Sequence, residues 1–219
     1  MDLLKEKVAI VTGAGSGIGR ACALFYARDG ARVVVSDVDI TGGDETVDLI
    51  RQAGGEAYFI RADVSKPGDC ARLVEETVKQ YGRLDYACNN AGIGGESNLT
   101  GEYSVEGWQK VIEINLSGVF YCMRYQIPEM LRTGGGSIVN MTSILGQVGF
   151  KAAPAYVAAK HGVVGLTRNA ALEYADQGIR VNAIGPAFIH TPLISSLEEN
   201  EQALNGLIAL HPIGRLGKP

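Results

Sequence analysis

The 219-residue chain has few cysteines and histidines, and it has no long apolar run. Its four cysteines form no C-x-x-C pair and no ligand cluster with the three histidines, so the sequence predicts neither a disulfide framework nor a metal site. No apolar run approaches the length of a membrane span. The charged segment before residue 8 also lacks the pattern of a signal peptide. We therefore expect a cytoplasmic protein with reduced thiols and no membrane partner.

The chain also lacks a strong charge of either sign. Its 20 Lys and Arg oppose 24 Asp and Glu, and no basic stretch is present, which argues against a nucleic-acid partner. Hydrophobic residues make up 46% of the chain, which argues against disorder. No repeat, linker or low-complexity segment interrupts the sequence, so we expect residues 1–219 to form a single domain.

Short apolar runs alternate with helical patterns along the whole chain. Apolar runs that end at glycine or at polar residues predict buried parallel strands, and a spacing of three to four predicts the helices between them. Strands are expected at 8–12, 33–36, 57–61, 84–88, 137–141 and 180–184. Helices are expected at 17–29, from the second strand to about 53, at 67–81, 104–132 and 155–174, with Pro128 kinking or ending the fourth. The fold class is therefore α/β, a doubly wound parallel sheet of Rossmann type in three α/β/α layers.

The loop after the first strand is rich in glycine. Glycines at 13, 17 and 19 give G-x-x-x-G-x-G, whereas the general G-x-G-x-x-G fingerprint fails because position 18 is isoleucine. Glycine permits a positive φ, a close approach of the backbone to a pyrophosphate, and close packing of helix on strand. The helix N-terminus then faces the diphosphate. We interpret this loop as a dinucleotide site; a plain glycine-rich turn is the alternative. Its expected cofactor contacts are Gly13, Ser16, Gly17, Ile18 and Gly19.

Asp37 ends the second strand, eighteen positions after Gly19, where a ribose-binding acid is expected. A carboxylate there accepts hydrogen bonds from the adenosine ribose and repels a 2′-phosphate. No arginine or lysine lies inside the glycine loop or just after Asp37. Both observations favour NAD over NADP, and a solvated turn aspartate is the alternative.

Four polar residues in the second half could support hydride-transfer chemistry; polar groups satisfied within helices and turns are the alternative. Tyr156 and Lys160 lie four apart in a helical pattern, so they share one face. Ser143 follows the fifth strand, at the sheet end where α/β proteins hold ligands, and Asn115 lies in the preceding long helix. Hydride leaves a carbinol carbon only as the hydroxyl proton is removed. We expect the Lys160 ammonium and an oxidised nicotinamide to lower the pKa of the Tyr156 phenol so that it can take that proton.

These residues, together with T-G-x-x-x-G-x-G at 12–19 and N-N-A-G at 89–92, resemble the classical short-chain dehydrogenase/reductase family over the whole chain. The resemblance implies a catalytic tetrad with Tyr156 as acid/base. It also implies that Lys160 binds the nicotinamide ribose and that Asn115 holds a water linking Lys160 to solvent. The further cofactor contacts it implies are Asp63, Val64, Asn90, Ala91, Gly92, Tyr156, Lys160, Pro186, Ile189 and Thr191.

Two of these positions carry alternatives. Asp63 could equally cap the helix that follows, before Ser65 and Pro67. Residues 185–186 read Gly-Pro where the family usually has Pro-Gly, so the backbone of that loop is not implied by the resemblance.

The residues expected around the substrate are mostly apolar. They are Leu145, Gln147, the loop 93–98 and the segment 188–197, and none of them is an arginine or lysine. We therefore expect a small, uncharged secondary alcohol or ketone. The stretches 107–109, 156–167 and 211–215 resemble bacterial cyclic-alcohol dehydrogenases. The alternatives are a 3-oxoacyl-thioester reductase, which would need basic residues near the second strand to bind NADP, and a nucleotide-binding protein without turnover.

The sequence also predicts self-association of the chain. The helices at 104–132 and 155–174 are apolar on more than one face, and the sheet can cover only one face of each. With the family resemblance, this predicts a homotetramer. Members of the family continue past a position like Pro219 with a helix and a last parallel strand, so we expect a longer full protein. The segment 192–210 is expected to form a lid over the substrate.

Overall fold

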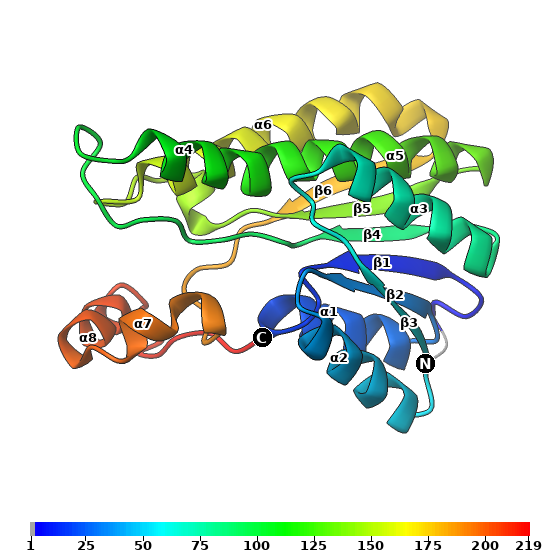
Figure 1. Ribbon diagram of the computed structural model, residues 1–219, viewed down its shortest axis with the longest axis horizontal. Coiled ribbons are helices and arrows are strands. Elements are labelled where there is room, and N and C mark those ends of the chain that lie inside the picture. Colours follow the sequence, from blue (N-terminus) through cyan, green and yellow to red (C-terminus); the bar gives the residue numbers. More distant parts are fainter. Residues whose placement is uncertain (1–2) are drawn as a thin grey trace.

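The computed structural model describes residues 3–219, in which six parallel strands form one sheet between two layers of helices (Figure 1). The strand order is β3-β2-β1-β4-β5-β6, so the direction of winding reverses between β1 and β4. The strands are β1 (Val8–Thr12), β2 (Arg32–Asp37), β3 (Glu56–Arg61), β4 (Tyr86–Asn89), β5 (Gly136–Met141) and β6 (Ile179–Ile184). This confirms the predicted fold class and places the ligand-binding switch point at the carboxyl ends of β1 and β4.

Both faces of the central strand are buried, as its unbroken apolar sequence predicts. Every residue of β1 is buried, and successive side chains enter different cores. Ile10 packs with the helices α3 (Pro67–Tyr81), α5 (Gly118–Arg132) and α6 (Pro154–Tyr174). Ala9 and Val11 pack on the opposite side, under α1 (Gly17–Arg28) and α2 (Ile40–Gln52) (Figure 1).

The strand predicted at 84–88 begins two residues later than expected. The carboxylate of Asp85 accepts the N–H of Val8 at 3.0 Å, a donor that a strand carbonyl would otherwise bind. Regular pairing therefore starts only at Tyr86, opposite Ala9.

The long helix predicted at 104–132 is continuous but not uniform. It consists of α4 (Val105–Ile112), a π-helical turn at Glu113–Ser117, and α5. Pro128 lies inside α5 and does not end it, contrary to one of the two expectations. The π turn inserts an extra residue into the helix at Asn115, a distortion that often accompanies functional sites.

A chain of buried polar side chains connects the sheet to the helices above it. Asn89 on β4 donates to Gln126 of α5 at 3.1 Å and to Asn140 of β5 at 3.0 Å. Asn140 in turn donates to Thr167 of α6 at 3.0 Å. Buried amides are costly unless they are paired, so these bonds specify how α5 and α6 sit on β4 and β5.

After β6 the chain leaves the sheet. It forms a 3₁₀ turn at Pro192–Ile194 and two short helices, α7 (Ser195–Glu198) and α8 (Glu201–Ala209), which lie away from the sheet in Figure 1. The chain then returns, and Gly217 makes an isolated parallel bridge with Ile189. β6 is an edge strand of the described sheet, and its last residue, Ile184, is 52% exposed.

Candidate active site

A cavity of about 280 Å³ lies at the carboxyl ends of β1, β2 and β4, at the switch point. We call it the cofactor cavity. The cofactor residues predicted from the sequence that line it are Gly13, Ser16, Gly17, Ile18, Asp37, Asp63, Val64, Asn90, Ala91, Gly92 and Thr191. Tyr156, Lys160, Pro186 and Ile189 line an adjoining cavity instead. Gly19 lines neither.

The glycine turn has the geometry that its sequence predicts. Gly13 and Gly17 have φ values of +63° and +51°, in the left-handed region that favours glycine. A Cβ on Gly19 would lie 2.0 Å from the carbonyl oxygen of Gly13, so this glycine permits close packing of α1 on the turn. The turn therefore leaves the N-terminus of α1 facing the cofactor cavity, where it suits a diphosphate.

The Asp37 carboxylate is fixed beside this turn. Its Oδ2 accepts the N–H of Gly15 at 2.8 Å, and its Oδ1 accepts the N–H of Asp39 at 3.0 Å. The side chain lines the cofactor cavity, in the position expected for a ribose-binding acid.

Arg20 is a basic residue next to the glycine loop that the sequence reasoning did not consider. Its guanidinium donates to the carbonyls of Gly15 and Gly42 and to Thr46 Oγ1, and it forms an ion pair of 2.9 Å with Glu45. These partners engage Nε and Nη2 of the arginine and brace α1 against α2. Arg20 directly follows Gly19, the last glycine of the motif, and this position could have predicted a contact with the loop.

The N-N-A-G segment ties the end of β4 to the end of β1. Thr12 Oγ1 accepts the N–H groups of Asn90 and Ala91 at 3.0 and 3.2 Å. The Asn90 amide donates to the carbonyls of Thr12 and Gly13 at 3.0 and 3.1 Å. The two sides of the switch point are thus joined by side-chain bonds in addition to the strand ladder.

The adjoining cavity, which we call the substrate cavity, measures about 290 Å³. Its lining includes residues 94–97 from the first half of the chain and Ser143, Tyr156 and Lys160 from the second half. It shares Ile18, Asn90, Gly92, Thr191 and Leu193 with the cofactor cavity. A cofactor in the first cavity can therefore meet a substrate in the second, next to the predicted tetrad.

The expected lining of the substrate cavity is right for Leu145 and for much of the loop 93–98 and the segment 188–197. It is wrong for Gln147, which is exposed outside the cavity because the 3₁₀ turn at Ile144–Gly146 directs the chain outward. Residues 150–153 line the cavity instead, including Lys151, which the sequence reasoning missed. No local pattern signals them, since their place depends on the path of that turn.

Tyr156 and Ser143 meet in the substrate cavity. Tyr156 is the third residue of α6, and Ser143 precedes the 3₁₀ turn after β5. Burial raises the pKa of the Tyr156 phenol, and its hydrogen bond with the Ser143 side chain acts in the opposite direction. The net direction is upward because the phenol is desolvated. The lowering of this pKa that is expected from Lys160 together with an oxidised nicotinamide stays a prediction.

Lys160 lies next to this pair but does not hydrogen-bond to the phenol. Its ammonium donates to the carbonyl of Met141 at 2.8 Å, and Nζ lies 5.5 Å from the centroid of the Tyr156 ring. Burial lowers the pKa of Lys160 to about 8. The lysine thus places a positive charge near the phenol only while it remains protonated.

Asn115, at the π turn, holds the start of the loop 93–98. Its Oδ1 accepts the N–H of Ile93 and its Nδ2 donates to the carbonyl of Ile93, both at 2.8 Å. The side chain is fully buried. Its implied role in holding a water stays a prediction, whereas its geometric role in the structure is to fix Ile93.

The comparisons with known proteins agree with this geometry. The family model described as enoyl-(acyl carrier protein) reductase matches residues 13–219. Cyclohexanol dehydrogenase of Acinetobacter sp. (strain SE19) is 52% identical over 98% of this chain and 83% of that protein. The chain belongs to the short-chain dehydrogenase/reductase family.

Further relatives narrow the chemistry of this short-chain dehydrogenase/reductase. Cis-4-hydroxycyclohexanecarboxylate dehydrogenase of Sinomonas cyclohexanicum is 44% identical over the whole chain and 86% of that protein. The crystal structure of levodione reductase superposes with a TM-score of 0.95 at 37% identity, over 98% of this chain and 86% of that one. The protein is therefore an oxidoreductase that acts on CH–OH groups and uses a nicotinamide cofactor.

The remaining predicted residues of this short-chain dehydrogenase/reductase have clear structural places. Asp63 Oδ1 accepts the N–H and the hydroxyl of Ser65 at 3.0 and 2.7 Å, so it caps the turn before α3. A contact of Asp63 or Val64 with adenine stays a prediction. The carbonyl of Pro186 accepts the N–H of Ile144 at 2.8 Å, which joins the reversed Gly-Pro loop to the turn after Ser143.

Residues 3–219 contain neither a cluster of metal ligands nor a membrane-spanning helix. No group of three His, Cys, Asp or Glu residues in this part of the chain could hold a metal ion. No helix in the described part is long and apolar enough to cross a membrane.

Proposed function

We propose that this short-chain dehydrogenase/reductase transfers a hydride between NAD and a small, uncharged cyclic secondary alcohol or its ketone. The observation that carries the proposal is the substrate cavity, which is lined mainly by apolar side chains and contains Ser143 and Tyr156 where it adjoins the cofactor cavity. Glu96 and Lys151 also line it, and their opposite charges leave no net charge that would select an ionic substrate. The relatives named for cyclohexanol and cyclohexanecarboxylate substrates support a cyclic substrate.

In the proposed mechanism, Tyr156 removes the hydroxyl proton of the alcohol as the carbinol carbon loses its hydride. The nicotinamide, when bound, accepts that hydride. The Ser143 hydroxyl donates to the substrate oxygen and orients it toward the phenol. The Lys160 ammonium, near the Tyr156 ring, stabilises the phenolate against the desolvation that raises its pKa. In the direction of ketone reduction, Tyr156 returns the proton.

The preference for NAD follows from Asp37 and Arg20. A 2′-phosphate beside the Asp37 carboxylate would be repelled, whereas ribose hydroxyls can donate to it. A compensating cation would be needed to bind NADP, and the nearby Arg20 is already engaged by Glu45 and by backbone carbonyls. The cofactor cavity therefore favours NAD.

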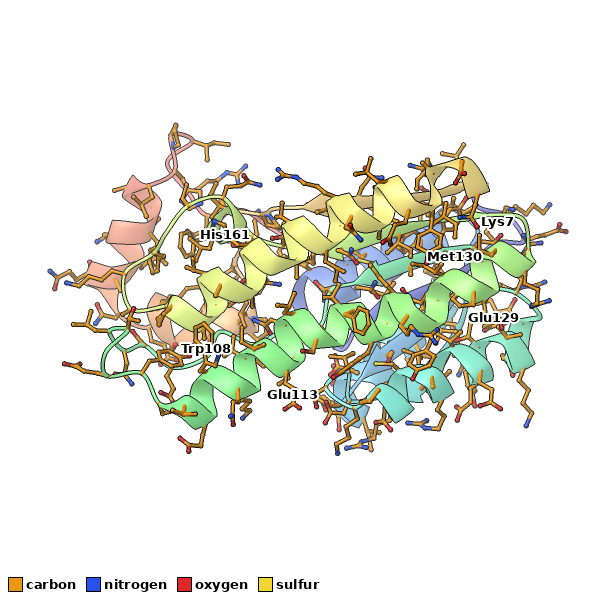
Figure 2. All side chains as sticks on the ribbon, turned by 90° about the horizontal axis from the view of Figure 1, so that it is seen from above. Lys7, Trp108, Glu113, Glu129, Met130 and His161 are labelled. Carbon is orange, nitrogen blue, oxygen red and sulfur yellow. The ribbon has the colours of Figure 1, made fainter. Side chains whose placement is uncertain are left out.

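Self-association is also part of the proposal. The helices α4, α5 and α6 lie side by side on one outer face (Figure 2). Large apolar side chains remain uncovered along them: Trp108 is 41% exposed, Phe120 47% and Leu172 84%. A second copy of the chain would bury this face, and a tetramer would use it together with further contacts. The four cysteines are free thiols, which suits the proposed cytoplasmic location.

Turnover measurements test the proposal. The purified protein is assayed with NAD and with NADP against cyclohexanol, 2-butanol and 1-butanol, and with NADPH against a 3-oxoacyl thioester. We expect oxidation of cyclohexanol with NAD to give the highest kcat/KM. Faster reduction of the thioester with NADPH would favour the reductase alternative, and no turnover of any alcohol would contradict the proposal.

A further inference from the structure

Two aromatic rings form one wall of the substrate cavity, and a third ring packs behind that wall. Phe150 and Phe188 both line the cavity, with ring centroids 5.6 Å apart and planes tilted by 53°. His211 is not among the lining residues, but its ring lies edge-on to Phe188 with centroids 5.9 Å apart. The histidine therefore supports Phe188 from outside the cavity.

His211 also joins the main chain of Phe188 to the end of α8. Its Nε2 accepts the N–H of Phe188 at 3.3 Å, and its Nδ1 lies 2.7 Å from the carbonyl oxygen of Leu207. A carbonyl can only accept, so the hydrogen of the neutral ring is on Nδ1 and Nε2 is free to accept. Both ring nitrogens are thus used, and one tautomer satisfies both bonds. Leu207 is buried, which gives the bridge a fixed end.

The carbonyl of Phe188 is held by the same returning segment. Gly217 donates its N–H to this carbonyl at 3.0 Å, and the main-chain N–H of His190 donates to the carbonyl of Gly217 at 3.0 Å. The segment 211–217 therefore engages both polar groups of the Phe188 main chain. Because the chain has already left the sheet at Ile184, these bonds determine where the Phe188 ring stands.

We propose that His211 is a specificity-determining positioning residue, which holds Phe188 against Phe150 so that the cavity selects compact ring-shaped alcohols over small acyclic ones. The inference rests on the proposed function for its substrate class. A fixed aromatic wall contacts a six-membered carbon ring over a larger area than a three- or four-carbon alcohol, so its loss costs the cyclic substrate more. The wall does not touch the proton that Tyr156 moves, so binding changes more than the rate of the chemical step.

Two substitutions separate the two bonds of His211. The glutamine of His211→Gln can present its carbonyl oxygen near the place of Nε2 and accept from Phe188, whereas the asparagine of His211→Asn can donate near the place of Nδ1 to Leu207. We expect His211→Asn to raise KM for cyclohexanol about tenfold, with kcat and the KM for 2-propanol each within about threefold of wild type. His211→Gln is expected to retain a KM for cyclohexanol within about threefold.

The matched control is His190→Asn, which changes the histidine two residues after Phe188. The His190 side chain is 75% exposed, pairs with Glu198 at 2.7 Å and lines neither cavity. It is expected to leave the preference for cyclohexanol over 2-propanol unchanged. An equal loss of preference in His190→Asn would overturn the proposal. Any disturbance of the chain after β6 would then explain the loss, without a specific role for His211.

A double-mutant cycle identifies the partner of His211. Phe188→Ala alone is expected to reduce the preference for cyclohexanol, and His211→Asn is expected to add little in the Phe188→Ala background. Additive effects of the two changes would overturn the proposal, because His211 would then act elsewhere.

The wild type tests the proposed function separately from this inference. Failure of wild-type enzyme to oxidise cyclohexanol would contradict the proposed function. Calorimetric titration of the NAD-loaded enzyme with cyclohexanone and with acetone then repeats the comparison without turnover. Equal affinities for cyclohexanone in wild type and His211→Asn would overturn the role of His211, while wild-type turnover would still support the proposed function.

Discussion

Asn115 and Ile93 form two hydrogen bonds of 2.8 Å each, in which one side-chain amide pairs with both polar groups of one main-chain residue. The pair joins the π turn between α4 and α5 to the loop that continues into the substrate cavity. A distortion in one helix thus sets the starting point of a loop that belongs to another part of the chain.

Removal of this amide should lower stability. Asn115→Ala leaves the N–H and carbonyl of Ile93 without these partners, so we expect the free energy of unfolding to fall by about 1–3 kcal/mol. The comparison is Asn98→Ala, whose exposed side chain makes only a 3.4 Å contact with Glu96 and should change stability by less than about 0.5 kcal/mol. Denaturant unfolding followed by circular dichroism measures both. Equal changes in the two variants would contradict the role of the Asn115–Ile93 pair.

Tyr156→Phe should abolish turnover and leave NAD binding almost intact. The change removes the hydroxyl that transfers the proton, and such a step is typically worth about 10²–10⁴-fold in rate. Steady-state rates measure the loss, and calorimetry with NAD measures the binding. Tyr58→Phe, on the edge strand β3, is the control and should retain wild-type rates. Activity above about a tenth of wild type in Tyr156→Phe would show that another group moves the proton.

Asp37→Ser should shift the cofactor preference toward NADP. The serine no longer repels a 2′-phosphate and binds the ribose hydroxyls less well, so Kd should rise for NAD and fall for NADP. Asp39→Ser changes a carboxylate two residues away that does not line the cofactor cavity, and it should leave the ratio of the two constants unchanged. If the wild type used both cofactors equally well, the role of Asp37 would be refuted.

The buried ammonium of Lys160 should make the stability of the enzyme without cofactor depend on pH. Burial lowers the pKa of Lys160 to about 8 in the folded protein, below the ordinary lysine value of 10.5. Between these values the unfolded chain binds more protons, so this group makes the folded state more stable as pH rises through that window. Lys160→Met removes the charge, and its gain in Tm over wild type at pH 7 should shrink by pH 9.5. A Tm difference that stays constant over this range would contradict the lowered pKa.

Leu172→Glu should weaken self-association. The substitution places a charge on the outer face formed by α4, α5 and α6, where Leu172 is the most exposed of the large apolar side chains. Light scattering at micromolar concentration should report a lower mass than for wild type. The control Leu210→Glu alters a leucine that is 63% exposed beyond α8 and should retain the wild-type mass. A stable wild-type monomer would remove the proposed assembly altogether.

Much of the fold could be predicted because its signals are local. The apolar run of β1 and the glycines at 13, 17 and 19 define strand and turn through burial and steric freedom alone. The π turn could not be predicted, since one extra helical residue near Asn115 does not disturb the apolar spacing. The burial that raises the pKa of Tyr156 could not be predicted either, because it depends on distant segments of the chain.

The candidate site could be predicted in part. The residues at strand ends meet because parallel strands present their carboxyl ends at one edge of the sheet. Gln147 and Phe150 could not be assigned correctly, since a three-residue turn after β5 determines which of them enters the cavity. The bridge from His211 to Phe188 spans 23 residues and has no sequence period that would indicate it.

The bonds between Thr12 and Asn90 have a consequence for the timing of the catalytic cycle. They fasten the floor of the cofactor cavity across the switch point and resist its opening. We therefore expect the dinucleotide to enter and leave by movement of the segment after β6, where Thr191 lies against Gly17 and lines the cofactor cavity. Loop motions of this kind commonly take microseconds to milliseconds and limit many turnover numbers. A substitution that slows the movement of this segment would accordingly lower kcat and leave the proton transfer at Tyr156 unchanged.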